Sequence, residues 1–151
     1  MSAFEQATHL DPQFAEAYSS KSLVLCDLGR YEEALSACEQ AIHLSPKLTV
    51  AYQNKGNVLY DLKRYKEALN VFEQAIDLDP QFAEAYNGKG NVLYYLRRYE
   101  EALSAFGQAI DLDPQFAHAY NGKSSVLEHL GKHTEAKQAY EKARQLGANY
   151  Y

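Results

Sequence analysis

The sequence predicts an all-α protein, an α-solenoid of stacked helix-turn-helix repeats, on three observations. The four prolines recur every 34 residues, at Pro12, Pro46, Pro80 and Pro114. Residues 49–82 and 83–116 are identical at 24 of 34 positions. Apolar residues inside each repeat recur at the three- and four-residue spacing of a helix face. A fixed period of about 20 to 50 residues is typical of arrays in which each repeat packs only on its neighbours.

The period divides the chain into a half repeat and four full repeats. The expected boundaries are 1–14 for the half repeat, which has a second helix only, then 15–48, 49–82, 83–116 and 117–151, the last with a short tail. In the third full repeat, apolar spacing predicts a first helix from Ala83 to Leu96 and a second from Glu100 to Leu112. The residues Arg97, Arg98 and Tyr99 are left as the turn between them.

A proline closes each repeat, because proline cannot continue the second helix. Proline suits the first turn of the following helix, and the aspartate before it is a favoured helix cap. Asp113 and Pro114 are therefore expected to open the next helix.

Small residues predict close packing between the two helices of a repeat. Glycine within a helix costs about 1 kcal/mol relative to alanine, so its presence there implies that another helix approaches closely. The alanines in phase on the second helix supply a matching flat surface, and the phenylalanines beside them fill the remaining gap. The expected packing residues are Gly56, Gly90, Ala68, Ala102, Phe72, Phe106, Pro80 and Pro114.

Composition restricts the class of partner and the compartment. The net charge is −5, whereas nucleic-acid binding needs a basic surface, so we expect no nucleic acid and a partner that is neutral to basic. No apolar run reaches the roughly 18 residues of a membrane helix, and the start has no signal pattern. Cys26 and Cys38 fit neither a disulfide framework nor a zinc motif, so we expect reduced thiols in a cytoplasmic protein.

The residues that recur in the third repeat are Tyr86, Gly90, Leu93, Ala102, Phe106, Ala109 and Pro114. This pattern resembles the tetratricopeptide repeat family over nearly the whole chain. The resemblance implies a right-handed superhelix with a concave groove lined by the first helix of each repeat. One departure concerns the turn, where the glycine kept at Gly29 and Gly131 is replaced by Lys63 and Arg97. If this turn needs a positive φ, Lys63→Gly is expected to stabilise the protein.

The resemblance also implies which residues line a peptide-binding groove. They are Gln53, Asn54, Asn57, Tyr60, Asn87, Asn91, Tyr94, Tyr95 and Asn121, followed on the last repeat by Ser125, Glu128 and His129. Asparagine is a poor helix former, so its repetition on helices needs a reason. Its amide both donates and accepts, so a ladder of such residues can grip an extended peptide backbone. The alternative is that these are solvated polar residues copied by duplication.

The sequence therefore predicts a scaffold that binds an extended peptide or a partner protein in the concave groove. The alternative is a self-association module that assembles through the exposed half repeat and the tail, Tyr150 and Tyr151. A helical repeat that binds RNA is a weaker third hypothesis, because such arrays are typically basic. We expect no enzyme, no cofactor and no metal site, since the histidines and cysteines show no catalytic or ligand spacing.

The two ends of the array differ in sequence. The half repeat lacks its first helix, which predicts an array that extends further on that side. In the last repeat Lys137 and Arg144 replace Leu103 and Ile110, a change typical of a terminal capping repeat. The chain is thus expected to be the C-terminal part of a longer array.

Overall fold

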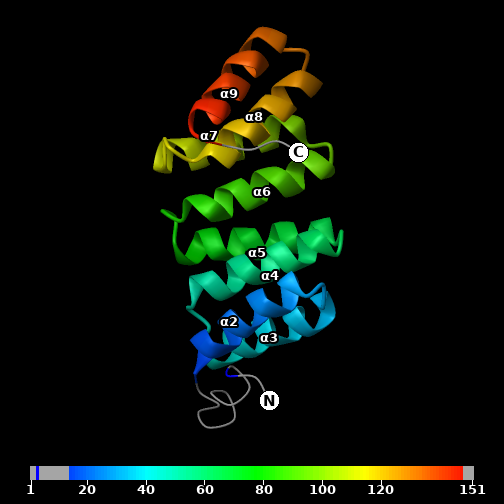
Figure 1. The fold of residues 1–151 in the computed structure, drawn as a ribbon, viewed down its shortest axis with the longest axis vertical. Helices are drawn as coiled ribbons and strands as arrows, with labels where there is room; N and C mark the ends of the chain where they lie inside the picture. The colour runs from blue at the N-terminus through cyan, green and yellow to red at the C-terminus, as the bar shows by residue number, and fades with distance from the viewer. Residues whose placement is uncertain (1–2, 4–13, 148–151) are drawn as a thin grey trace. The chain divides into compact units, whose positions relative to one another are not determined.

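A computed structural model describes Ala3 and residues 14–147, and in that part of the chain it contains eight α-helices and no strand (Figure 1). The helices are α2 (Ala15–Asp27), α3 (Tyr31–Leu44), α4 (Thr49–Asp61), α5 (Tyr65–Leu78), α6 (Ala83–Tyr95), α7 (Tyr99–Leu112), α8 (Ala117–His129) and α9 (His133–Gln145). The all-α class with paired helices is confirmed. Most of the predicted half repeat, and the tail tyrosines, lie outside the described residues.

The chain divides into two compact units, Met1–Asp79 and Pro80–Tyr151. In the first unit, α3 packs against both α2 and α4, and the first helices α2 and α4 also touch directly. In the second unit, α7 packs against α6 and α8, and α6 touches α8. Each unit therefore holds two helix pairs joined in the same way.

The turn inside each helix pair is set by one residue with a positive φ. Lys63 and Arg97 both have a φ of 60°, and the glycines at the same position have values of 72° at Gly29 and 76° at Gly131. The prediction that Tyr99 belongs to the turn is wrong, because α7 begins at that residue. The left-handed residue alone reverses the chain, so that Arg98 O already accepts the first helical hydrogen bond, from Ala102 N at 2.9 Å.

The link between helix pairs differs from the prediction. Pro114 lies in a turn ahead of α8 and not in its first turn, and the residue that caps α8 is Phe116. Phe116 has a φ of −78° and a ψ of 87°, and its carbonyl accepts from Ala119 N at 3.1 Å. The Asp113 carboxylate instead accepts from Gln115 N at 3.1 Å and holds the turn. Gln115 and Phe116 separate Pro114 from the first residue of α8, so Asp113 lies too far from this helix to cap it.

The tyrosine that recurs in each first helix fastens this link. The Tyr120 hydroxyl donates to Pro114 O at 3.2 Å, and the Tyr52 hydroxyl donates to Pro46 O at 3.0 Å. The phenol thus reaches back over six residues and gives the proline carbonyl of the link a hydrogen-bond donor.

Phenylalanine and glycine share the space between helices. Phe106 on α7 is only 1% exposed. A Cβ atom added to Gly90 on α6 would lie 2.8 Å from its ring, and one added to Gly122 on α8 would lie 2.3 Å from it. The Phe106 ring therefore packs against both α6 and α8, the first helices on either side of α7. In the first unit, a Cβ atom added to Gly56 on α4 would lie 2.5 Å from the Phe72 ring on α5.

We predict that Lys63→Gly and Arg97→Gly each stabilise the protein, by about 0.5–1 kcal/mol. The left-handed conformation costs a residue other than glycine roughly 1–2 kcal/mol, and glycine avoids this cost. Glycine loses more conformational entropy on folding, which cancels part of the gain. Equilibrium unfolding in urea measures the change. Lys66→Gly, on the exposed side of α5, is the matched control and should lose about 1 kcal/mol. A lower stability for both turn variants would contradict the left-handed turn.

Candidate functional site: the face of the first helices

The polar residues of the first helices divide into two groups by burial. Gln53 and Asn54 on α4 are buried, with exposed fractions of 9% and 6%. Asn57, one turn further along α4, is exposed. The remaining predicted groove residues are half-buried or exposed, namely Tyr60, Asn87, Asn91, Tyr94, Tyr95 and Asn121. Only this second group offers side-chain surface to a ligand.

Asn54 joins two neighbouring first helices. Its Nδ2 donates to Ser19 Oγ on α2 at 2.9 Å, and both side chains are buried. The amide is thus engaged in holding α4 against α2. Burial of this hydrogen bond makes it costly to break, since either polar group would remain without its partner in a dry contact.

In the second unit, the Phe106 ring takes the place of this polar contact between first helices. Two periods further along the chain, Ser19 corresponds to Asn87 and Asn54 to Gly122. Gly122 has no side chain to offer, because the Phe106 ring occupies that space. Asn87 Oδ1 is buried and has no hydrogen-bond partner among the described residues. The Asn87 amide oxygen, like Gln53 Oε1 on α4, therefore points to no protein donor in this part of the chain.

The size of one residue on the second helix decides between these two arrangements. Cys38 on α3 stands where Phe106 stands on α7, and it is fully buried. The smaller side chain leaves room for Ser22 and Asn54, where the second unit has Gly90 and Gly122. Burial raises the pKa of the Cys38 thiol to about 11, so it serves as a packing residue and not as a nucleophile.

Aromatic side chains gather at the C-terminal end of the first helices in the second unit. Tyr94 makes edge-on contacts with Tyr95, Tyr99 and His129, with ring centroids 5.3, 5.8 and 5.2 Å away. His129 also stacks on Tyr99, with centroids 4.8 Å apart. Burial raises the pKa of the Tyr94 phenol. The rings thus support one another, and Tyr95 remains 51% exposed at the edge of the group.

Tyr99 was missed in the prediction of this face, because it was assigned to the turn. A signal was present in the sequence, since Tyr31, Tyr65 and Tyr99 recur at the 34-residue period. In the first unit Tyr65 makes the same kind of contact with Tyr60, edge-on at 5.8 Å. The tyrosines that open α5 and α7 therefore support the tyrosines near the ends of α4 and α6.

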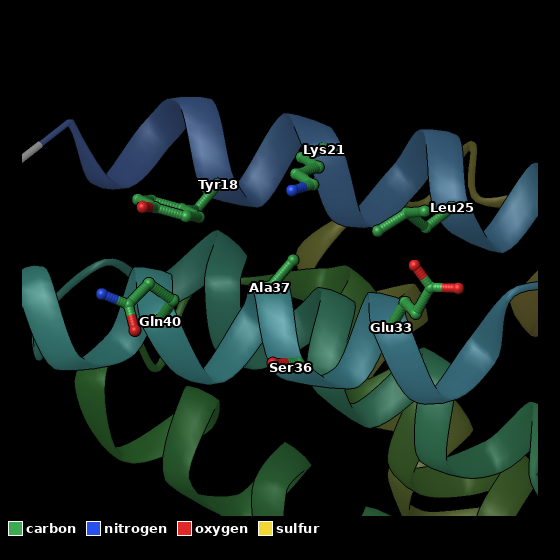
Figure 2. A pocket seen from close by; sticks show the side chains of 7 residues that line it. All are labelled: Tyr18, Lys21, Leu25, Glu33, Ser36, Ala37 and Gln40. Carbon is green, nitrogen blue, oxygen red and sulfur yellow. The ribbon is translucent and has the colours of Figure 1, made fainter. Parts of the chain in front are cut away.

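A separate pocket of about 470 Å³ lies between α2 and α3 (Figure 2). Its walls include Tyr18, Lys21 and Leu25 from α2 and Glu33, Ala37 and Gln40 from α3. This pocket was not predicted from the sequence. Among the residues that the structure describes, no group of three or more His, Cys, Asp or Glu side chains could hold a metal ion. None of the described helices combines the length and the apolar composition of a membrane-spanning segment.

Family models match overlapping parts of the chain. Residues 56–97 match a TPR repeat model, residues 87–151 match a tetratricopeptide repeat model, and residues 3–75 match the model of anaphase-promoting complex, cyclosome, subunit 3. Together with the helix pairs and their 34-residue period, these matches identify the chain as a tetratricopeptide repeat protein. A sequence comparison with curated proteins gave no match.

Solved structures of similar fold include other solenoids of this family. MamA from Desulfovibrio magneticus RS-1 is 25% identical, with a TM-score of 0.82 over 95% of this chain and 81% of that one. PilF from Pseudomonas aeruginosa is 21% identical, with a TM-score of 0.87 over 97% and 67%. The first TPR domain of Spaghetti (RPAP3), bound to the HSP90 peptide SRMEEVD, is 23% identical, with a TM-score of 0.76 over 80% and 96%. These likenesses support the fold.

Asn54 and Asn57 make a matched pair for separating structure from binding. We predict that Asn54→Ala lowers the free energy of unfolding by about 1–2 kcal/mol, because it removes a buried hydrogen bond and leaves Ser19 Oγ without its donor. Asn57→Ala, at an exposed position of the same helix, should change it by less than about 0.5 kcal/mol. Chemical denaturation of both variants checks this. Equal losses would contradict the assignment of Asn54 to helix packing.

Proposed function

We propose that this protein binds an extended segment of a partner protein along the exposed face of its first helices. The tetratricopeptide repeat fold is that of a protein-interaction scaffold. The finer assignment rests on one observation, the repetition of an asparagine followed three residues later by a tyrosine on the same helix face, as in Asn57 with Tyr60 and Asn91 with Tyr94. Both asparagines are at least partly accessible.

Each of these side chains has a distinct part in the proposed binding. An asparagine amide can accept from a peptide N–H and donate to a peptide C=O, so it grips the backbone whatever the peptide sequence. The tyrosines add a rigid apolar area with a polar tip, a composition favoured at interfaces. In the second unit the support of Tyr94 by Tyr99 and His129 lowers the cost of ordering that surface on binding.

The charge of the surface favours a ligand that is neutral or basic. Asp61, Glu84 and Glu128 on the first helices are exposed, and the whole chain carries a net charge of −5. Like charges placed opposite each other across an interface oppose binding, so an acidic tail is disfavoured. The peptide in the RPAP3 structure, SRMEEVD, contains three acidic side chains, and we propose that this chain selects a different class of peptide.

We assign the protein no catalytic role. Both thiols are free, and burial raises the pKa of Cys26 as well as that of Cys38, which holds both as weak nucleophiles near neutral pH. The cytoplasmic location expected from reduced thiols stays a prediction.

A peptide array tests the proposed face. We predict that the double variant Asn57→Ala with Asn91→Ala binds its best peptides about tenfold or more weakly, since each lost amide contact is worth about 1 kcal/mol. Tyr95→Ala should weaken the same peptides, and basic or neutral peptides should dominate the hits. The control is Asn70→Ala, an exposed asparagine on the second helix α5, which should leave binding unchanged. Peptides that bind the double variant as tightly as the unmodified protein would sink the assignment, and so would an equal loss in the Asn70→Ala control.

A further inference from the structure

The pocket between α2 and α3 corresponds to a surface that is covered in the second unit. There, Leu103 of α7 packs against a cluster that contains Leu127 and Ala139. Three periods earlier in the chain, these two residues correspond to Leu25 and Ala37, which both line the pocket. The pocket is therefore the counterpart of the surface on α8 and α9 that α7, the preceding second helix, covers.

The chain enters α2 in the same way as it enters α4. Phe14, ahead of α2, has a φ of −81° and a ψ of 84°, and Leu48, between α3 and α4, has values of −78° and 91°. The carbonyl of each accepts from the amide three residues later, at 3.2 Å from Ala17 N and 3.0 Å from Ala51 N. A second helix joined to Phe14 by a link of the same length is thus directed onto α2 as α3 is onto α4.

The sequence ahead of α2 carries a phenylalanine of fitting size. Phe4 stands three periods before Phe106, whose ring packs against α8 at Gly122. Ser20 on α2 stands three periods before Gly122 and is also small, so it leaves room for a ring. The smaller Cys38 at this position of α3 goes instead with a larger asparagine on α4. Because interiors are packed at a nearly fixed density, this relation between sizes favours a contact of Phe4 with α2.

A charged residue on α2 specifies a further part of what covers the pocket. In the first unit, Lys55 Nζ on α4 lies 3.7 Å from Glu39 Oε1 on α3, the second helix that precedes it. Lys21 stands one period before Lys55, and Figure 2 shows its side chain directed into the space between α2 and α3. Glu5 stands one period before Glu39, so the sequence ahead of α2 supplies the matching carboxylate. Opposite charges thus meet in the same register that the apolar residues indicate.

We propose that the α2–α3 pocket is covered by the residues of this same chain that precede Phe14, which dock on it as a second helix. In this register Met1, three periods before Leu103, covers Leu25 and Ala37. The pocket then belongs to the packing of the repeats and is not a ligand site. This proposal does not depend on the proposed peptide-binding face, because none of the residues that carry it is assigned to that face.

Cross-linking of engineered thiols in the full chain tests the proposal. In a Cys26→Ser background, Glu5→Cys with Lys21→Cys places one thiol at each end of the proposed ion pair, and the native Cys38 is fully buried. A short bismaleimide should join the two thiols within one chain, which gives a monomer that has gained a single linker by mass spectrometry. The matched control is Glu5→Cys with Lys66→Cys, at an exposed position on α5, which should gain two linkers, one on each thiol.

Paired charge reversal is the second measurement. Glu5→Lys alone and Lys21→Glu alone are each expected to lower Tm by about 2–4 °C, because each places like charges opposite one another. The double variant Glu5→Lys with Lys21→Glu should recover most of the loss, since it pairs opposite charges again. The matched double variant Glu5→Lys with Lys66→Glu should recover none of it.

Three results would overturn the proposal. The first is a cross-link that joins two chains, as expected if a second copy covers the pocket. The second is a Glu5→Cys, Lys21→Cys chain that gains two linkers as often as the control does, as expected if another protein covers the pocket. The third is a pair of charge reversals whose effects on Tm add without any recovery. The peptide array on the same samples reads the proposed peptide-binding face separately.

Discussion

The structure depends on how closely a second helix approaches the first helices on either side of it. In the second unit the approach is fixed by one buried ring, Phe106, which fills the space that Gly90 and Gly122 leave open. In the first unit the smaller Cys38 permits Ser22 and Asn54 at the corresponding positions. A large residue on the second helix thus goes with small residues on the first helices, and a small one goes with larger ones, because protein interiors are packed at a nearly fixed density. A change of size at the second-helix position is thus tolerated only together with the opposite change at the two first-helix positions.

This packing also decides which polar residues remain for binding. Asn54 and Asn57 are three residues apart on one helix, yet the neighbouring helix α2 covers the first and leaves the second exposed. The contact surface and the accessible surface are two adjacent stripes of the same helix. A ligand therefore contacts the accessible stripe of a helix that the buried stripe already holds in place. Because the helix backbone is fixed before binding, the entropy lost on binding is smaller.

Much of the fold follows from the sequence, because the 34-residue period and the helical spacing of apolar residues act locally. The left-handed turn at Lys63 and Arg97 was predictable from the glycines at Gly29 and Gly131. The capping of α8 was not, since Phe116 has no capping side chain and takes its place only because the Pro114 turn precedes it. The burial of Asn54 also depends on another helix, which the sequence around it does not describe.

The most direct test of the packing account is the free energy of unfolding of Gly122→Ala beside that of Gly107→Ala. A Cβ atom at Gly122 would lie 2.3 Å from the Phe106 ring, whereas one at Gly107 meets nothing within 4 Å. The account predicts a loss of about 1–3 kcal/mol for the first variant and a gain of about 1 kcal/mol for the second. The loss should shrink when Phe106→Leu is introduced as well. Equal effects of the two glycine substitutions, or a loss that ignores the size of residue 106, would contradict it.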